Sequence, residues 1–323
     1  MIRDNGVLLE LREIRKHFPV KKSFFSADTL TVRAVDGVSL SVPAGKTVGL
    51  VGESGCGKTT LGRVAIRLMP PDEGTILFEG RDITTLAGEE LRRLRRKMQI
   101  IFQDPYSSLN PRMRVREIVG EGWLVHGIAK GAELRERAEA LLARVGLSPD
   151  AADRYPHEFS GGQRQRIGIA RAISLSPRLV VADEPVSALD VSVQAQILNL
   201  LRDIQEEYGI AYLFVSHDLR VIRHVSDTVA VMYLGRMMEV SPAADLFREP
   251  LHPYSRSLLS AVPLPGEPPR ETIVLKGEIP SPIHVPPGCR FHTRCFMARG
   301  LCEEQVPPLR EVAPGRSVAC HFV

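Results

Sequence analysis

The chain has 323 residues, of which 44% are hydrophobic and 25% charged, and its net charge is +4. This length predicts about two domains, and the composition excludes a disordered or fibrous protein. The weakly basic balance does not indicate nucleic-acid binding. No run approaches the roughly 18 apolar residues that span a bilayer, and the N-terminal segment MIRDNGVLLELREIRKHF carries acids that a secretory signal lacks. We therefore expect a protein of the cytoplasmic side that does not cross the membrane.

Short apolar segments and helical patterns alternate along the first 250 residues. The first 50 residues and 74–80 (GTILFEG) are expected to be antiparallel β-structure. Buried parallel strands are predicted at 47–52 (TVGLVG), 179–184 (LVVADE) and 211–217 (AYLFVSH), because these runs are short, apolar and β-branched. The helices predicted after them cover 58–68, 192–208 and 219–225, with Gly146 and Gly209 placed as helix C-terminal glycines. This repetition predicts an α/β core with a parallel sheet.

The region 104–175 is expected to form a helical subdomain inserted into this core. Its segment 133–147 (ELRERAEALLARVGL) has the leucine stripe of an amphipathic surface helix. The basic run 91–97 (LRRLRRK) could contact nucleic acid or lipid headgroups, but runs of charge on helices usually face solvent. We interpret it as a solvated helix face.

The amino-acid composition changes after residue 250, because ten of the 24 prolines lie from Pro250 to Pro287. Because proline is excluded from helix interiors and central strands, we expect a linker or extended arm there. It leads to a small, loop-rich C-terminal module that holds four of the five cysteines. The predicted domains are therefore 1–250 and 251–323.

The segment Gly52–Thr60 (GESGCGKTT) follows a predicted strand, precedes a predicted helix and matches the phosphate-loop pattern. Its backbone N–H groups would surround phosphates, Lys58 would reach the β- and γ-phosphates, and Thr59 would bind Mg²⁺. Cys56 is interpreted as a small filler. The residues predicted to bind nucleotide here are Gly52, Ser54, Gly55, Cys56, Gly57, Lys58, Thr59 and Thr60.

Two adjacent acids end the strand predicted at 179–184, a costly arrangement unless they face a metal ion or water. Asp183 is placed to hold Mg²⁺, and Glu184 to polarise an attacking water. Gln103, expected at the end of the strand MQIIFQ (98–103), could touch Mg²⁺ and water. His217 could hydrogen-bond the γ-phosphate and Glu184. Taken alone, either Gln103 or His217 is more often structural.

A second phosphate-facing site is predicted at 159–172 (FSGGQRQRIGIARA), where a serine and two glycines open a basic helix. Free backbone N–H groups and the helix dipole would attract a phosphate at this point. The chain therefore has two helix starts that could bind phosphate but one phosphate loop, so the helix start at 159–172 has no nucleotide of its own.

The phosphate loop, Gln103, SGGQ (160–163), LVVADEP (179–185), SALD (187–190) and His217 occur in the order found in ATPase subunits of ABC transporters, which the chain resembles from about residue 8 to 242. The resemblance implies a P-loop ATPase fold that binds ATP and Mg²⁺ and pairs head to tail with a second ATPase subunit. The SGGQ helix of one subunit would then face the γ-phosphate held by the other. It further implies roles for the signature residues Ser160, Gly161, Gly162 and Gln163, for Asp190 at the subunit contact and for Phe18 in stacking on adenine, although Phe18 could equally pack in the core.

Four further segments narrow the resemblance to ATPase subunits of oligopeptide and dipeptide importers, a group that includes carriers of nickel chelates and sugars: IFQDPYSSLNPRM (101–113), LHPYSRSLLSAVP (251–263), LKGEIPSP (275–282) and GCRFHTRC (288–295). It implies a sister or identical ATPase subunit, two membrane-spanning permease subunits, an external solute-binding protein, no nucleic acid, and a peripheral position on the cytoplasmic face of the inner membrane. The alternatives are a soluble ABC ATPase acting on DNA or the ribosome, and an exporter. Their coiled coils, zinc-finger insertions, second cassette or fused membrane domain are not seen in this sequence.

The C-terminal cysteines are spaced Cys289-x5-Cys295-x6-Cys302-x17-Cys320. In a reducing cytosol disulfides are disfavoured, and a module too small for its own core suggests a metal site. Zinc sites usually show closer pairs, whereas wide spacing suits a [4Fe-4S] cluster, which the family resemblance also implies. Zn²⁺ and free thiols remain the alternatives, with His292 and His321 as structural neighbours.

Overall fold

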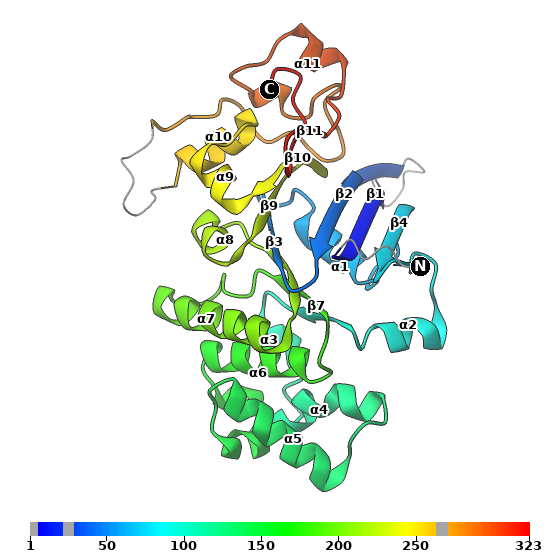
Figure 1. Ribbon diagram of the computed structural model, residues 1–323, viewed down its shortest axis with the longest axis vertical. Coiled ribbons are helices and arrows are strands. Elements are labelled where there is room, and N and C mark those ends of the chain that lie inside the picture. Colours follow the sequence, from blue (N-terminus) through cyan, green and yellow to red (C-terminus); the bar gives the residue numbers. More distant parts are fainter. Residues whose placement is uncertain (1–5, 22–28, 263–270) are drawn as a thin grey trace. The chain divides into compact units, whose positions relative to one another are not determined.

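The computed structural model describes residues 6–21, 29–262 and 271–323 (Figure 1). The chain forms two compact units, of which the first combines residues 1–85 with 214–323 and the second consists of residues 86–213. The first unit is therefore built from both ends of the chain. Within the described ranges, no helix combines the length and the apolar character needed to cross a membrane.

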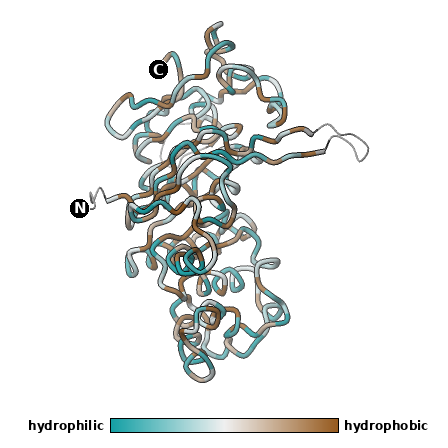
Figure 2. Tube along the Cα trace, turned by 90° about the vertical axis from the view of Figure 1, so that its right-hand side faces the viewer, coloured by the Kyte–Doolittle hydropathy of each residue, from teal (hydrophilic) through white to brown (hydrophobic). Residues whose placement is uncertain are grey.

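The first unit contains an antiparallel sheet with the strand order β2 (Thr29–Pro43), β1 (Val7–Lys21), β4 (Glu73–Phe78) and β5 (Arg81–Asp82). Leu9, Leu11 and Ile14 of β1 are buried, and apolar and polar colours interchange along these strands (Figure 2). The antiparallel structure predicted for the first 50 residues and for 74–80 is confirmed for β1, β2 and β4, whereas 1–5 and 22–28 lie outside the described residues.

A second sheet of the first unit carries the predicted phosphate loop. Its order is β11 (Arg310–Ala313), β12 (Arg316–Val318), β10 (Arg236–Pro242), β9 (Thr228–Tyr233) and β3 (Thr47–Val51). β3 and β9 are parallel and entirely or almost entirely buried, whereas β9, β10, β12 and β11 pair antiparallel. Residues 271–323 are called the C-terminal tail below, and their strands β11 and β12 extend this sheet. Strand β3 of the same sheet leads through the phosphate loop into α1 (Lys58–Ala65).

The second unit holds the parallel strands β6 (Met98–Ile101) and β7 (Leu179–Asp183) together with most of the helices. Its helices are α2 (Gly88–Leu94), α3 (Pro105–Ser108), α4 (Val115–Val125), α5 (Gly131–Arg144), α6 (Gly161–Ile173) and α7 (Val191–Tyr208). The mixed parallel and antiparallel α/β architecture agrees with the predicted fold class. Strand β8 (Ala211–Val215) starts in this unit and ends in the first.

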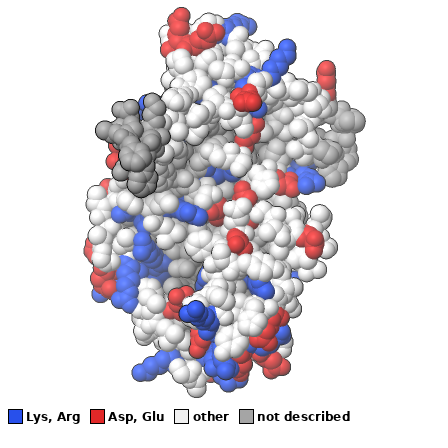
Figure 3. All heavy atoms as spheres, turned by 180° about the vertical axis from the view of Figure 1, so that it is seen from behind, with Lys and Arg blue, Asp and Glu red and all other residues white. Residues whose placement is uncertain are grey.

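The remaining helices belong to the first unit and include α8 (Leu219–Val225), α9 (Ala243–Arg248), α10 (Pro253–Ser260) and α11 (Gly300–Glu304). Helix α2, which carries most of the basic run 91–97, buries none of its residues, and Arg92 and Arg93 both pair with Glu89. This agrees with a solvated helix face. Basic and acidic side chains are interspersed over the face shown in Figure 3, as the small net charge suggests.

Two expectations differ from the structure. Part of the predicted linker, residues 251–262, contains the well-packed helix α10, while 263–270 lie outside the described residues. Pro253 occupies the first turn of α10, where its missing N–H costs no hydrogen bond, so the density of prolines was a misleading signal. Strand β6 ends at Ile101, and Gln103 lies in the loop beyond it.

Helix α10 packs its buried Tyr254 against Tyr233 of β9 and Phe291 of the tail, with ring centroids 4.8 and 5.2 Å away. The N-cap of this helix is His252, whose Nδ1 accepts a hydrogen bond from the backbone N–H of Tyr254 at 3.0 Å. Burial lowers the pKa of His252 to about 3, so the ring is neutral in the folded protein.

This buried histidine should make stability depend on pH. The unfolded chain protonates His252 below its ordinary pKa of 6.5, but the folded chain does not until about pH 3. The free energy of unfolding should therefore fall by about 2 kcal/mol between pH 6.5 and pH 5, at about 1.4 kcal/mol per pH unit. Urea unfolding at a series of pH values measures this. His252→Asn, which keeps a side-chain cap but does not titrate, should remove this component of the slope, whereas the exposed-histidine control His157→Asn should keep it. An unchanged slope in His252→Asn would contradict the assignment.

Candidate functional site

The predicted phosphate loop follows β3 and is shaped by glycines that leave no room for a side chain. Gly57 has φ +106°, and a Cβ there would lie 1.9 Å from the carbonyl oxygen of Ala34 in β2. Gly52 has φ +153°, and a Cβ there would lie 2.0 Å from the carbonyl oxygen of Met232 in β9. The loop therefore takes its curvature from direct contact with two neighbouring strands, and only glycine fits.

Lys58 is 5% exposed, and its ammonium group donates to the carbonyl oxygens of Gly52 at 2.8 Å and Glu53 at 3.0 Å. The ammonium thus lies over the loop that would receive phosphates, while Ser54 and Gly55 are exposed at its tip. Cys56 is buried beside Gly52, and burial raises the pKa of its thiol. This supports its interpretation as a filler.

In the second unit the structure brings two predicted catalytic residues together. The side-chain amide of Gln103 donates to Oε2 of Glu184 at 3.0 Å. Glu184 has φ +48°, a left-handed conformation that is rare and strained for a residue with a side chain. Asp183, at the end of β7, is 2% exposed. Asp183 is a buried carboxylate, and the next carboxylate, of Glu184, is oriented by the amide of Gln103. Oxygen donors of this kind suit a hard cation and water.

The predicted signature forms the N-terminus of α6. Ser160 is the N-cap, its Oγ accepting from the N–H of Gln163 at 3.4 Å while Oε1 of Gln163 accepts from the N–H of Ser160 at 3.0 Å. A Cβ on Gly162 would lie 2.5 Å from Cγ1 of Val193 in α7. The capping box and this close packing fix the exposed helix start at which a phosphate could bind.

The other predicted positions lie at the edges of their elements. His217 is exposed after β8, and the N–H of the preceding Ser216 donates to the carbonyl of Leu50 in β3 at 3.1 Å. Asp190 is the exposed N-cap of α7. Phe18 in β1 is half-buried, with the ammonium of Lys16 over its ring at 5.7 Å, so it does not belong to the closed core. Its role in stacking stays a prediction.

The four tail cysteines influence one another, although they do not form a metal-ion site. Burial, together with the nearby charges of Cys302, Cys295 and Cys320, raises the pKa of Cys289 to about 11. Among the residues that the structure describes, however, no three histidine, cysteine or acidic side chains form a group that could hold a metal ion. This arrangement does not support the predicted cluster or zinc site. His292 and His321 contact backbone carbonyl oxygens, of Cys289 and Gln305 respectively, as expected of structural histidines.

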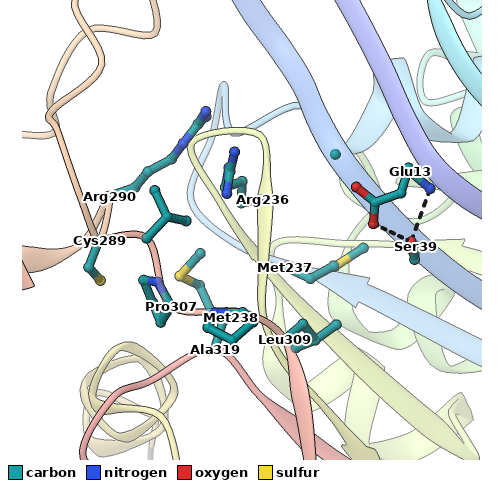
Figure 4. A pocket seen from close by; sticks show the side chains of 13 residues that line it. Glu13, Ser39, Arg236, Met237, Met238, Cys289, Arg290, Pro307, Leu309 and Ala319 are labelled. Carbon is teal, nitrogen blue, oxygen red and sulfur yellow. Dashed lines mark hydrogen bonds between the residues drawn. The ribbon is translucent and has the colours of Figure 1, made fainter.

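A cavity of about 440 Å³ opens beside the tail (Figure 4). Arg236, Met237 and Met238 of β10 line it together with Arg290 and Cys289. The Arg290 guanidinium is buried, pairs with Asp36 of β2 and donates to the carbonyl of Leu234. Burial lowers the pKa of Arg290 to about 10. Cys289 and Arg290 of this lining belong to the segment GCRFHTRC, but no residue that lines the cavity belongs to the phosphate loop or to the other nucleotide motifs.

Sequence reasoning missed the partners of Glu53, the second residue of the phosphate loop. Its N–H donates to the hydroxyl of Tyr254 at 2.9 Å, and its carboxylate accepts from Arg294 at 2.7 Å. Tyr254 and Arg294 both lie in segments quoted for the family resemblance, LHPYSRSLLSAVP and GCRFHTRC. The available signal in the sequence was a hydroxyl and a guanidinium in these two segments, since such polar groups need hydrogen-bonding partners when they are buried.

Comparison with known proteins identifies two families along the chain. Residues 35–187 match the ABC transporter family, and residues 238–302 match the oligopeptide/dipeptide transporter C-terminal region. The oligopeptide transport ATP-binding protein AppF of Bacillus subtilis is 56% identical over 319 residues, which cover 98% of this chain and 97% of AppF.

Two solved structures have the same fold. The ATP-binding cassette MJ0796, in a dimeric state bound to ADP and phosphate, has a TM-score of 0.64 and 28% identity over 73% of this chain and 99% of that one. The cbiO1 protein of Clostridium perfringens has a TM-score of 0.64 and 26% identity over 76% of this chain and 92% of that one.

The contact between Gly57 and Ala34 yields a direct test of the loop. Gly57→Ala should abolish nucleotide binding, because its Cβ cannot coexist with the carbonyl of Ala34 and the loop must open. The matched control is Gly168→Ala within α6, where a Cβ meets nothing within 4 Å. That change should leave binding intact and stabilise the helix by up to about 1 kcal/mol. Equilibrium binding of a fluorescent ATP analogue and thermal unfolding measure both, and normal binding by Gly57→Ala would contradict the loop geometry.

Proposed function

The chain belongs to the ABC transporter family, among its ATP-binding proteins of oligopeptide and dipeptide transport, and from this we propose that it hydrolyses ATP to drive the import of peptides. The observation that carries the proposal is that one chain matches both the ABC transporter family, at 35–187, and the oligopeptide/dipeptide transporter C-terminal region, at 238–302. The full-length similarity to a protein of oligopeptide transport supports it. Nickel chelates or sugars would be the related cargoes.

The residues divide the chemistry of phosphoryl transfer among them. The backbone N–H groups of the phosphate loop would hold the β- and γ-phosphates, and Lys58 would move its ammonium from the loop carbonyls to the phosphate oxygens. Thr59 and Asp183 would hold Mg²⁺, which neutralises charge on the transferred group. Glu184 would orient and polarise the attacking water. Its contact with Gln103 supports this role, because the amide fixes one carboxylate oxygen.

The signature helix and the phosphate loop imply a second chain. We propose that the exposed N-terminus of α6 binds the γ-phosphate held by the phosphate loop of a partner ATPase subunit, and that Asp190 lies at this contact. Symmetric pairing of this kind creates two composite sites. The dimeric cassette bound to ADP and phosphate supports the arrangement by analogy. The partner would be a sister subunit or an identical one.

The remaining partners follow from peptide import. Two membrane-spanning permease subunits would receive the motion of the helical subdomain through the segment after Gln103, and an external binding protein would deliver the peptide. The chain would lie peripherally on the cytoplasmic face of the inner membrane. The same proposal includes the predicted domains, an ATPase domain at 1–250 and a C-terminal extension at 251–323. The helical subdomain within the ATPase domain would cover about 104–175.

The replacement Glu184→Gln tests the proposed function. It keeps the size of the side chain and its contact with Gln103 but removes the base, so turnover should fall by about 10²–10⁴-fold while ATP binding persists. Phosphate release and uptake of a labelled peptide by the reconstituted transporter should be lost together. Glu136→Gln, on the exposed face of α5, is the control and should retain both. Near-normal turnover in Glu184→Gln would refute its role, and ATP turnover in the wild type without any peptide uptake would refute the cargo.

We also propose that the tail cysteines hold a [4Fe-4S] cluster, with Zn²⁺ as the alternative. The wide spacing of the cysteines along the sequence supports this proposal, because zinc sites usually contain closer pairs. Full-length protein purified without oxygen should contain about four irons with matching sulfide and absorb near ~400 nm. Cys295→Ser should lose the iron while retaining ATP binding. One zinc per chain, or no metal, would refute the cluster.

A further inference from the structure

The C-terminal tail contacts the phosphate loop at Glu53. The guanidinium of Arg294, which is 9% exposed, donates to the Glu53 carboxylate at 2.7 Å. From helix α10, the hydroxyl of Tyr254 accepts the Glu53 N–H at 2.9 Å. Residues 201 and 241 positions further along the chain therefore hold the second residue of this loop.

The carbonyl of Glu53 is engaged as well, by the ammonium of Lys58 at 3.0 Å and the N–H of Cys56 at 3.3 Å. Every polar group of Glu53 thus has a partner within the first unit. The next two residues, Ser54 and Gly55, are exposed. Glu53 is therefore the fixed end of the loop, and its tip is the part open to a ligand.

Packing immobilises the two side chains that hold Glu53. Tyr254 is fully buried, and its ring lies against Tyr233 and Phe291. Arg294 extends over the ring of Tyr233, 5.9 Å from its centroid, and makes a second hydrogen bond to its hydroxyl at 3.4 Å. Because these groups have little freedom left, the contacts to Glu53 cost little further ordering.

We propose that Arg294 and Tyr254 are positioning residues that hold the phosphate loop in its nucleotide-binding conformation. Through them, the C-terminal tail and helix α10 set the affinity for nucleotide. When phosphates bind, Lys58 must release the carbonyls of Gly52 and Glu53 to reach them. Glu53 then depends on Tyr254 and Arg294 to keep the loop from relaxing. A loop preorganised in this way binds nucleotide without an ordering cost.

The consequence is a change in binding rather than in chemistry. In this proposal the contacts to Glu53 stabilise the bound nucleotide and the transition state equally, so their loss should raise KM for ATP and leave kcat nearly unchanged. Thermodynamic reciprocity adds a second consequence, because nucleotide must stabilise the docked tail by the same factor by which the docked tail strengthens nucleotide binding.

The inference rests on nucleotide binding at this loop, which the wild-type protein tests separately by calorimetric titration of the full-length chain with Mg-ADP. Arg294→Gln and Glu53→Gln should each raise the dissociation constant about five- to twentyfold, since each breaks a partly buried charged hydrogen bond. Because both changes remove one interaction, the double variant should be no weaker than the weaker single variant. Arg294→Lys should recover part of the affinity, as only one guanidinium nitrogen contacts Glu53. Tyr254→Phe should weaken binding by leaving the Glu53 N–H unpaired.

The matched control is Arg299→Gln, which removes a guanidinium from the same tail, where it lies over Phe322 and not the phosphate loop. Its affinity should equal that of the wild type. Unchanged affinity in Arg294→Gln, or additive losses in the double variant, would overturn the proposal even if the wild type binds Mg-ADP normally.

A second measurement remains informative if a variant folds poorly. In the wild type, saturating Mg-ADP should slow hydrogen exchange of the backbone amides of 291–295 by the same five- to twentyfold factor, about the reciprocal coupling expected. Two of these amides, of Arg294 and Cys295, are bonded within the segment to Phe291 and His292. Exchange that nucleotide leaves unchanged would show that the tail is not coupled to the loop and would overturn the proposal.

Discussion

The curvature of the phosphate loop is the constraint on which the first unit depends. Two of its glycines touch the carbonyl oxygens of Ala34 and Met232 so closely that no Cβ fits. The loop therefore cannot take its shape unless β2 and β9 are already in place, and the Glu53 contacts add α10 and the tail to this set. A local motif of nine residues thus requires four segments drawn from both sides of it along the chain. This explains why the tail shares one compact unit with the N-terminal strands.

Most secondary structure and the nucleotide motifs could be predicted from sequence because their signals are local. The strands at 47–52, 179–184 and 211–217 are short apolar runs, and the helix start at Ser160 is a capping box that can be recognised in four letters. Predictions were poorer where the signal is tertiary. Prolines suggested a linker where α10 packs, and Gln103 was placed on a strand that ends two residues earlier. The tail was interpreted through its cysteines, whereas its arginines make the contacts with the core.

Buried charge links the same segments. Asp36 of β2 is 6% exposed and faces guanidinium groups from β1, β10 and the tail, those of Arg15 at 3.4 Å, Arg236 at 3.7 Å and Arg290. Burial alone would raise the pKa of Asp36, but Arg290 and Arg236 lower it below its ordinary value. Removal of any one of these partners should strongly destabilise the fold, because the remaining charges would stay buried and unbalanced. The segment 290–294 therefore joins the core by two ion pairs, one at Asp36 and one at Glu53.

The discontinuous composition of the first unit has a consequence for synthesis of the protein. A ribosome releases the chain from its N-terminus, and domains generally fold as units when their residues have emerged. The second unit is a continuous segment that is complete at residue 213, whereas the first unit needs Arg294 and strand β12, close to the end of the chain. During translation, the phosphate-loop segment must therefore wait for its last partners until β12 has been made. In that interval strand β2 lacks its ion pair between Asp36 and Arg290 and its hydrogen bond from Arg33 to Pro282, so the first unit remains incompletely packed while the second unit can already fold.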